Sequence, residues 1–369
     1  MKKVLFLINS LGQGGAEKVL VNLVNYMDSS KFDITVMALF GGGVNEQFLK
    51  PEIKYKKIFP KTIPGNSKLM KLFTPKQLHA FFIKEKYDVE VSYLEGPCAR
   101  IVSGCSSPCT RLVNWIHVEQ HTRGAASASF RSEKEAERCY GKFDQHVFVA
   151  DTVKQDFLRL FPQNKPCVVL YNTVESDVIF QKSKEKAPEI ENNACIRLVS
   201  IGTLKQAKGF DRLLRIQKKL INDGYKVHLY LLGKGPLRSK LEEYVRDNGL
   251  IANVTFLGYQ TNPYKYVAKC NLFVCSSHAE GFSTAATEAL IVGTPVCTVE
   301  VSGMKEMLGE HNEWGLVTEN SEEALYNGIK RLLDDENLLA YYKKQAEIRG
   351  RIFNTENTVN AVEKMLDQC

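Results

Sequence analysis

The sequence predicts an α/β protein built from two doubly wound, Rossmann-like domains that face each other across a cleft. A chain of 369 residues fits two domains better than one or three. A short apolar strand, a glycine-containing loop and an amphipathic helix occur in that order at residues 4–27 and again at residues 196–221. Short apolar strands that alternate with helices are typical of parallel sheets covered by helices.

The domain boundaries are predicted from a polar stretch that precedes the second strand–loop–helix unit. Residues 181–194 (QKSKEKAPEIENNA) are aperiodic, which is typical of a linker. We therefore expect an N-terminal domain over residues 1–178, a linker over 179–194 and a C-terminal domain over 195–351.

The composition argues against several other classes of protein. The chain is 44% apolar and 25% charged, so general disorder is not expected. No apolar run approaches the roughly 18–20 residues that a membrane-spanning helix needs. The N-terminal run in MKKVLFLINSLGQGG is too short for a signal peptide and is predicted to be a strand. The ten cysteines form no C-x-x-C pair, so we expect buried thiols in a reducing cytosol.

The first predicted strand, Val4–Ile8, leads into a loop with Gly12, Gly14 and Gly15 and then into a helix. Glycine lets a ligand approach the backbone closely, so this loop indicates a phosphate or sugar site. A dinucleotide-binding fingerprint is less favoured, because the pattern is G-x-G-G and the second strand, Ile34–Phe40, ends without a ribose-binding acid. A tight turn that binds no ligand remains the other alternative.

Residues 50–86 contain ten lysines and only two acidic residues, with phenylalanine, leucine and isoleucine between the lysines. This composition predicts either a solvated lysine face or a surface attracted to anionic lipid, at roughly 1 kcal/mol per lysine near the membrane. Nucleic-acid binding is not expected, because the segment has no arginine and no accompanying motif.

Polar residues follow three further predicted strands of the N-terminal domain, and strand ends line the clefts of doubly wound folds. The strands and the residues after them are Val89–Leu94 with Glu95, Arg111–Ile116 with His117, and Val168–Leu170 with Asn172. Asp88 and Glu90 are expected at a solvated edge. No metal site is expected at HVEQH (117–121), because it is not H-E-x-x-H and has no evident third ligand.

Glycine also follows the predicted strands of the C-terminal domain. These strands are Ile196–Ile201 before Gly202, Val227–Leu232 before Gly233, and Val254–Leu257 before Gly258. Tyr259 is expected to form a wall for a nucleotide base.

The stretch 276–295 (SSHAEGFSTAATEALIVGTP) is the most informative part of the sequence. It follows an apolar strand, Leu272–Cys275, and contains a loop with Glu280 and then a helix that Ser283 or Thr284 can cap. A helix N-terminus at the carboxyl end of a parallel strand binds anions. Glu280 and Glu288 flank that N-terminus and can accept hydroxyl groups, so the stretch predicts a site for a sugar phosphate, most simply a nucleotide sugar.

The residues EGFSTAATEAL…GTPV resemble the signature of the retaining GT-B glycosyltransferases of family 4. The resemblance implies that Glu280 contacts the transferred sugar and that Glu288 binds the ribose of the nucleotide. It also implies that His117 contacts the transferred sugar and that the last helix, within residues 352–369, crosses back to the N-terminal domain. GGAEKVLVNL and the turn at Asn172 are similar to the opening loop and the domain-end turn of the same family.

Positive charge is needed where the nucleotide diphosphate leaves, because negative charge develops there in the transition state. Lys208 matches the lysine of the family's Arg-x4-Lys pair, but Thr203 stands at the arginine position. Either Lys205 reaches the diphosphate instead, or the enzyme is slow, or the protein is not a transferase. No D-x-D motif occurs, so no catalytic metal is expected, and a glycosidase would not need this lysine.

The predicted function is retaining transfer of a hexosyl unit from a nucleotide sugar, with UDP as the expected nucleotide, to a lipid-linked saccharide in capsular, exopolysaccharide or other surface-glycan synthesis. The expected location is cytoplasmic and peripheral, on the anionic inner face of the cell membrane. A non-catalytic nucleotide-sugar-binding module and another GT-B enzyme of sugar-nucleotide metabolism are the alternatives. Catalysis is assigned to Glu280, Lys208, His117 and Lys205, and acceptor binding to Glu95 and Asn172. Donor binding is assigned to Glu288, Gly14, Gly15, Gly202, Thr203, Gly233, Gly258, Tyr259, Gly281, Phe282, Ser283 and Thr284.

Overall fold

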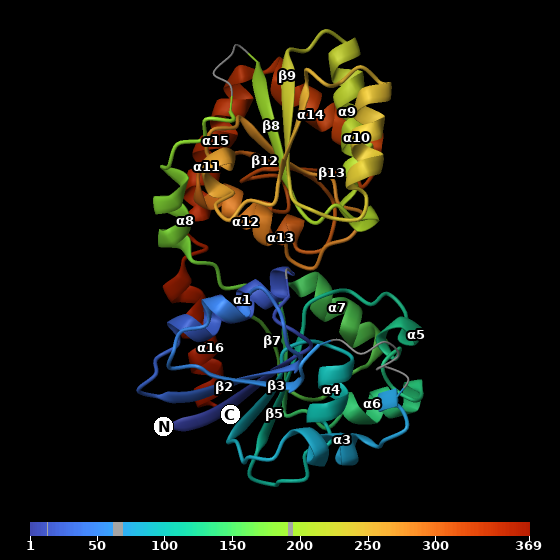
Figure 1. The fold of residues 1–369 in the computed structure, drawn as a ribbon, viewed down its shortest axis with the longest axis vertical. Helices are drawn as coiled ribbons and strands as arrows, with labels where there is room; N and C mark the ends of the chain where they lie inside the picture. Colours follow the sequence, from blue (N-terminus) through green and yellow to red (C-terminus); the bar gives the residue numbers. More distant parts are fainter. Residues whose placement is uncertain (13, 62–68, 191–194) are drawn as a thin grey trace. The chain divides into compact units, whose positions relative to one another are not determined.

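Two parallel β-sheets organise the chain, one in each of two units (Figure 1). The computed structural model describes residues 1–369 except 13, 62–68 and 191–194. Every strand pairing within the described residues is parallel, and helices connect the strands. The predicted class of two Rossmann-like, doubly wound domains is therefore confirmed.

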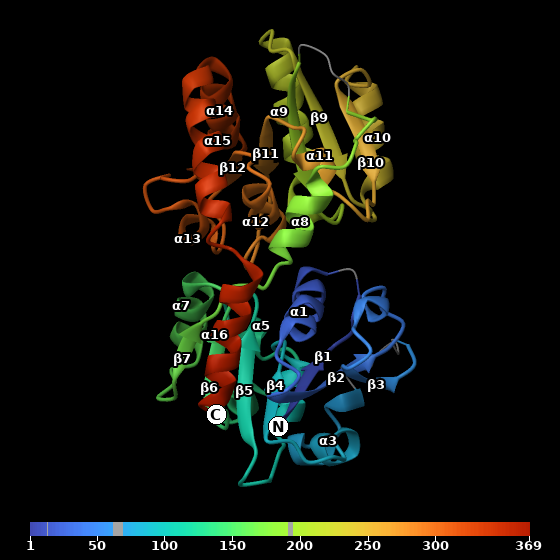
Figure 2. The ribbon, with the colours of Figure 1, turned by 90° about the vertical axis from the view of Figure 1, so that its left-hand side faces the viewer.

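The first unit comprises Met1–Val174 and Thr355–Cys369, and the second comprises Glu175–Asn354. The last helix, α16 (Thr355–Asp367), thus belongs to the first unit (Figure 2). Lys2 Nζ donates to the Leu366 carbonyl over 2.8 Å, and Glu363 accepts from the backbone N–H of Asp28 over 2.6 Å. These contacts fix the end of the chain to its beginning.

The first sheet has seven strands in the order β3-β2-β1-β4-β5-β6-β7. Since β1 lies between β2 and β4, the order reverses between β1 and β4, and ligands of such sheets bind at the carboxyl ends of these strands. In chain order the strands are β1 (Lys2–Ile8), β2 (Phe32–Phe40), β3 (Lys54–Phe59), β4 (Val89–Ser92), β5 (Arg111–Ile116), β6 (Gln145–Phe148) and β7 (Cys167–Val169).

Helices cover both faces of this sheet, with α1 and α16 in contact on one face and α4 and α6 on the other (Figure 1). Right-handed crossovers place α1 and α4 on opposite faces, because the chain moves in opposite directions along the sheet at the two connections. Besides α16, the helices are α1 (Gly15–Tyr26), α3 (Pro75–Phe82), α4 (Pro97–Val102), α5 (Arg123–Ala126), α6 (Glu133–Tyr140) and α7 (Asp151–Leu160).

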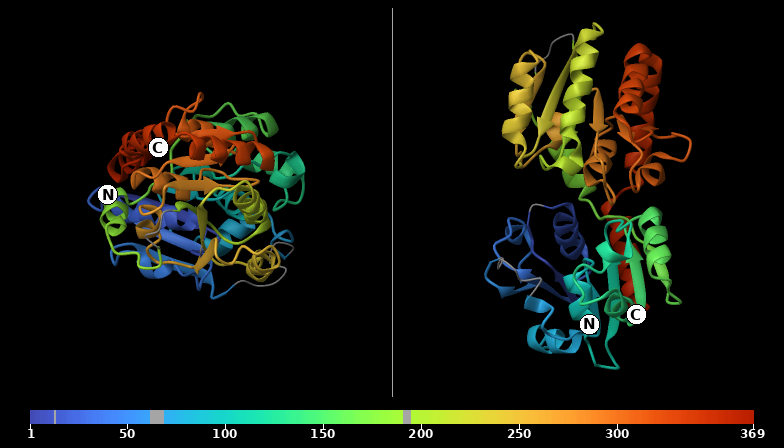
Figure 3. Two further views of the ribbon diagram at one scale, coloured as in Figure 1. Left: turned by 90° about the horizontal axis from the view of Figure 1, so that it is seen from above. Right: turned by 90° about the vertical axis from the view of Figure 1, so that its right-hand side faces the viewer.

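The second sheet has six strands in the order β10-β9-β8-β11-β12-β13, so its order reverses between β8 and β11. The strands are β8 (Ile196–Ile201), β9 (Val227–Leu232), β10 (Val254–Gly258), β11 (Leu272–Cys275), β12 (Val296–Val299) and β13 (Leu316–Thr318). Helices α9 (Phe210–Asn222), α10 (Arg238–Asp247) and α14 (Glu322–Asp334) share one face. Helices α11 (Tyr264–Val267), α12 (Thr284–Ile291) and α15 (Glu336–Gly350) share the other, and α13 spans Met304–Leu308. Figure 3 shows the strands of the second unit with helices on either side of them.

The predicted linker at 179–194 needs correction. Helix α8 (Ser176–Ser183) includes its first residues and packs against α11 and α12, with Ile179 buried. The helix is too short for sequence periodicity to reveal it, and Ile179 is buried only through tertiary contacts. Residues 191–194 lie outside the described part of the chain.

The expectation for Glu90 was also wrong. Strand β4 lies in the middle of the first sheet, and the Glu90 side chain is only 2% exposed and contacts His79 on α3. Alternation within one strand shows which residues share a face, but it does not show what covers that face. Asp88, just before the strand, is exposed and accepts from the backbone N–H of Lys3 over 2.8 Å.

The lysine-rich segment contains an edge strand that the sequence did not indicate. Strand β3 pairs with β2, and exposed lysines on an edge strand discourage pairing with other chains. Lys54 pairs with Asp33 over 2.6 Å and Lys56 with Glu85 over 2.5 Å, so these two charges are partly balanced. Lys68 lies outside the described residues.

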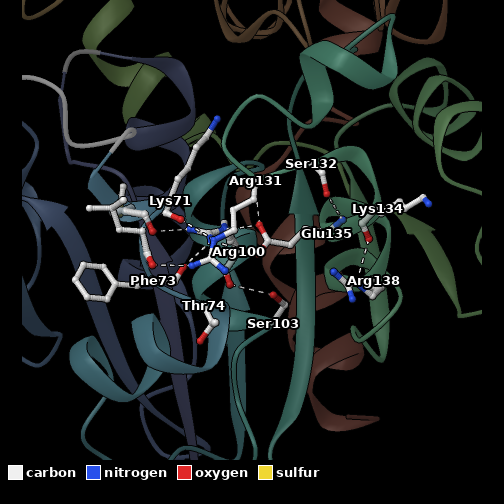
Figure 4. Close-up of polar contacts among 12 residues, drawn as sticks. Lys71, Phe73, Thr74, Arg100, Ser103, Arg131, Ser132, Lys134, Glu135 and Arg138 are labelled. Atoms are coloured by element: carbon white, nitrogen blue, oxygen red, sulfur yellow. Dashed lines mark hydrogen bonds and ion pairs between the residues drawn. The ribbon is translucent and has the colours of Figure 1, made fainter.

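Two arginines fix residues 70–73 onto the helices of the first unit (Figure 4). Buried Arg100 on α4 donates to the carbonyls of Met70 and Phe73, and it also pairs with Glu135 on α6 over 3.0 Å. Arg131 donates to the carbonyls of Lys71 and Leu72. The side chain of Leu72 is nevertheless 71% exposed, so the segment presents apolar and basic side chains on a fixed backbone.

No helix among the described residues is both long and apolar enough to cross a membrane.

Candidate active site

The loops that follow β8 and β11 meet where the strand order of the second sheet reverses. His278 donates its backbone N–H to the Ala207 carbonyl over 2.7 Å, and Ser276 Oγ donates to the Lys208 carbonyl over 3.1 Å. These bonds hold the two loops together. Ligands of doubly wound sheets bind at this position, so the loops form the candidate donor site.

Lys208 and Glu280 form an ion pair within this site. Lys208 Nζ lies 2.6 Å from Glu280 Oε1 and 2.8 Å from Oε2. Ser277 Oγ donates to the same carboxylate over 2.6 Å. The Glu280 side chain is 10% exposed and that of Lys208 is 31% exposed, so the cation can still be reached from solvent. The structure thus brings together the two residues to which the sequence gave the central catalytic roles.

Arg212 positions the loop that carries Ser277, and sequence reasoning missed it. This buried side chain on α9 donates to the carbonyls of Ser276 and Ser277, each over 2.6 Å, and to Asn320 Oδ1 over 2.9 Å. A guanidinium can satisfy several carbonyls at once because its donors form a rigid fork. No sequence signal marks Arg212, since its partners lie far along the chain.

Helix α12 begins as predicted, with Ser283 as its N-cap. Ser283 Oγ accepts from the backbone N–H of Ala286 over 3.4 Å. Glu288 lies on this helix, is buried, and accepts a long hydrogen bond of 3.4 Å from the Tyr264 hydroxyl. The ring of Phe282 is buried and packs edge-on against Phe353. A nucleotide-sugar donor can therefore contact the backbone of Phe282 rather than its ring.

The glycines at the carboxyl ends of β8, β9 and β10 lie next to one another, with Gly258 as the last residue of β10. Gly233 donates its N–H to the Gly258 carbonyl over 2.7 Å, and its φ is +141°. A Cβ at Gly233 would lie 1.9 Å from the Gly202 carbonyl oxygen, so only glycine fits there. Tyr259, which directly follows Gly258, is 48% exposed, and Lys234 Nζ lies 5.9 Å from the centroid of its ring.

Thr203, at the family's arginine position, and Lys205, the candidate replacement cation, differ in exposure. Thr203 directly follows Gly202 and is half-buried, whereas Lys205 is exposed. The structure brings Lys208, not Lys205, to Glu280.

At the carboxyl ends of β4 and β5 in the first unit, Glu95 and His117 are in contact. Glu95 Oε2 accepts from the backbone N–H of His117 over 3.0 Å, and the Tyr93 ring lies 4.8 Å from the His117 ring. Burial lowers the pKa of His117 to about 3, so its imidazole is neutral, and burial raises the pKa of Glu95. His117 Nε2 is buried and has no hydrogen-bond partner among the described residues.

The remaining predicted residues of the first unit lie around α1. Gly14 is its N-cap and Gly15 its first residue. On the same helix, Asn22 Nδ2 donates to the Thr173 carbonyl over 3.3 Å, which fixes the turn that contains the buried Asn172.

Comparison with known proteins agrees with this fold. Residues 181–349 match the family described as Glycosyl transferases group 1. The chain is 27% identical over 379 residues to the N-acetylgalactosamine-N,N'-diacetylbacillosaminyl-diphospho-undecaprenol 4-alpha-N-acetylgalactosaminyltransferase of Campylobacter jejuni, with 96% of each chain covered. Sucrose-phosphate synthase from Thermosynechococcus elongatus has a TM-score of 0.80 at 17% identity, covering 100% of this chain and 99% of that chain. Anabaena Alr3699/HepE in complex with UDP and glucose has a TM-score of 0.79 at 18% identity, covering 100% of both chains.

The family match over residues 181–349 and the relative from Campylobacter jejuni indicate a glycosyltransferase, and the two solved structures show that its fold is GT-B.

Proposed function

We propose that the protein transfers a hexosyl unit from a UDP-sugar, with retention of anomeric configuration, to a lipid-linked saccharide in the synthesis of a capsular or other surface polysaccharide. The observation on which the proposal depends is the Lys208–Glu280 ion pair at the switch point of the second sheet. The structural relative from Anabaena was solved with UDP and glucose, which supports UDP as the nucleotide.

The ion pair suggests how the donor is activated. An arriving diphosphate competes with Glu280 for Lys208, and the freed carboxylate then accepts hydroxyl groups of the transferred sugar. Lys208 and the N-terminus of α12 stabilise the charge that develops on the leaving phosphate, so no catalytic metal takes part. Glu288 binds the ribose, and the backbone of residues 281–284 lies along the diphosphate.

We assign His117 to a hydroxyl of the transferred sugar. A neutral imidazole exchanges hydrogen bonds with a hydroxyl, and the buried Nε2 lacks a partner among the described residues. Departure and attack take place on the same face of the sugar, and the leaving phosphate accepts the proton of the acceptor hydroxyl. Retention then requires no protein nucleophile.

The acceptor is assigned to the first unit, with Glu95 and Asn172 as binding residues and with Gly14 and Gly15 at the start of α1. The relative from Campylobacter jejuni acts on a saccharide joined by a diphosphate to undecaprenol, and this supports a lipid-linked acceptor. A capsular polysaccharide glycosyltransferase of Staphylococcus aureus, 26% identical over 162 residues, supports the surface-polysaccharide role.

Peripheral binding to the anionic inner face of the membrane is proposed for the surface around α3. Leu69, Leu72 and Phe81 are between 50% and 71% exposed there. Lys71 lies beside them in the chain and Lys76 is exposed on α3. Exposed apolar side chains with lysines between them are typical of an interfacial surface.

A direct assay tests the transfer. Thermal shift with UDP-, GDP- and ADP-sugars identifies the donor, because a ligand raises the melting temperature by mass action. Extracted lipid-linked saccharides are then added, and free UDP and the anomeric configuration of the product are measured. We expect stabilisation by UDP-sugars and acceptor-dependent UDP release with retention. An inverted product would overturn retention, and a donor that binds but never releases UDP would indicate a binding module.

A further inference from the structure

Three side chains of metal-binding type meet in the first unit near the amino end of β4. His79 comes from α3, Glu90 from β4, and Cys105 from the loop after α4. One ligand atom from each lies within 4.8 Å of the others. The group lies away from the carboxyl ends of the strands, where Glu95 and His117 form part of the proposed active site.

The surrounding backbone fixes this arrangement. His79 Nε2 is 2.8 Å from Glu90 Oε2. A Cβ at Gly104 would lie 2.0 Å from the Pro75 carbonyl oxygen and 2.9 Å from His79 Cβ, so glycine lets the loop with Cys105 approach α3. Arg100 on α4 adds a second link, because it donates to the Phe73 carbonyl just before α3 (Figure 4).

Burial and charge also suit a divalent cation. The Glu90 side chain is 2% exposed and that of His79 is 15% exposed, whereas Cys105 is half-exposed. A buried carboxylate needs a positive partner. A thiolate, a carboxylate and a neutral imidazole together balance two positive charges. His79 Nε2 is the group nearest to the buried Glu90 carboxylate, and Cys105 lies on the more exposed side of the same group.

We propose that His79, Glu90 and Cys105 bind one divalent metal ion of the zinc type. Nitrogen, sulfur and carboxylate oxygen are the ligands that zinc accepts in proteins, and three protein ligands leave a fourth position for water on the side of Cys105. Cys105 binds as the thiolate and releases its proton to solvent. The metal links α3, β4 and the loop after α4, and it has no part in sugar transfer.

Cobalt(II) and zinc(II) test the site with the metal alone. The full chain is freed of metal with a chelator, kept reduced and titrated with Co²⁺, whose bond to a thiolate gives a near-ultraviolet charge-transfer band. We expect one Co²⁺ per chain, displaced by Zn²⁺, and a melting temperature that rises with Zn²⁺. Cys105→Ser should abolish the band and weaken Zn²⁺ binding by at least about tenfold.

Cys109→Ser is the matched control, since Cys109 is exposed and lies outside the group of three ligands. It should keep the band and the zinc-dependent rise in melting temperature. Glu90→Gln keeps the shape of the side chain and should weaken binding without removing the sulfur-to-metal band. A wild-type chain that binds no metal, or a band that persists in Cys105→Ser, would overturn the proposal. In either case His79 and Glu90 form only a pair with each other, and Cys105 is a neighbouring thiol.

Discussion

Lys208 Nζ lies within hydrogen-bonding distance of both carboxylate oxygens of Glu280, at 2.6 Å and 2.8 Å, although the two residues are 72 positions apart in the chain. The Lys208 ammonium and the Glu280 carboxylate therefore fix each other's position in the site. The nucleotide-sugar donor is proposed to separate them when it binds. Donor binding would exchange this ion pair for a pair between Lys208 and a diphosphate. The first two predictions depend on that exchange.

Lys208→Ala should lower turnover far more than Lys205→Ala, which is the matched control from the same loop. Loss of one preorganised charge on a leaving group is typically worth about 3 kcal/mol, or roughly a hundredfold in rate. Steady-state release of UDP measures both variants, and thermal melting checks that both are folded. If Lys205→Ala proves the more harmful, Lys205 has the role that Thr203 does not fill.

Glu288→Ala and Glu280→Ala should affect different kinetic parameters. Glu288 is assigned a ribose contact made in both the ground and transition states, so its loss should raise KM and the dissociation constant of UDP. Glu280 is assigned to the reacting sugar, so its loss should mainly lower kcat. Equal, small changes in both parameters for both variants would contradict the assignment.

Arg212→Lys should lower both the free energy of unfolding and the turnover rate. Lysine cannot satisfy the carbonyls of Ser276 and Ser277 in the geometry of the fork, and hydrogen bonds of charged groups contribute about 1.5–3 kcal/mol. Denaturant unfolding and kcat measure the two effects. Arg215→Lys, on the exposed side of the same helix, is the control and should change neither by much. If Arg212→Lys left kcat unchanged, the role of Arg212 would be restricted to stabilising the fold.

The imidazole of His117 should stay neutral between about pH 7 and about pH 5. Burial lowers its folded-state pKa from 6.5 to about 3, so the unfolded chain takes up the proton first as pH falls. The contribution of His117 to the free energy of unfolding is therefore complete above pH 6.5 and is lost as the pH falls toward about 3. Histidine NMR titration checks the first statement. His117→Gln should show a smaller loss of unfolding free energy over the same window, and an unchanged loss would contradict it.

Leu69→Ser together with Leu72→Ser should weaken binding to anionic vesicles. Both side chains are more than half exposed beside lysines, and insertion of apolar groups would act together with the charge. Co-sedimentation at low and high salt measures binding, which should fall with salt because the attraction is screened within about 8–10 Å at physiological ionic strength. Ile251→Ser removes a side chain that is 67% exposed in the second unit and serves as the control. If the wild-type protein does not bind anionic vesicles at low salt, the lysines form only a solvated face.

Local patterns in the sequence determined the strand–loop–helix units, the loops with Lys208 and Glu280, and the cap at Ser283. Such features depend on residues close in the chain: an apolar run, a glycine or a hydroxyl at a helix start. Strand β3 and helix α8 were not predicted from the sequence. The lysine-rich edge strand shows no clear apolar alternation, and a helix of two turns is too short to show a clear apolar period.

Only the tertiary structure decided which distant residues meet. The order of the strands places β8 beside β11, and this brings Lys208 to Glu280 and Arg212 to the carbonyls of Ser276 and Ser277. The same kind of convergence buries Glu90 in a central strand, against His79 and Cys105. Strand order follows from the packing of all helices and strands at once, and no short stretch of sequence contains it.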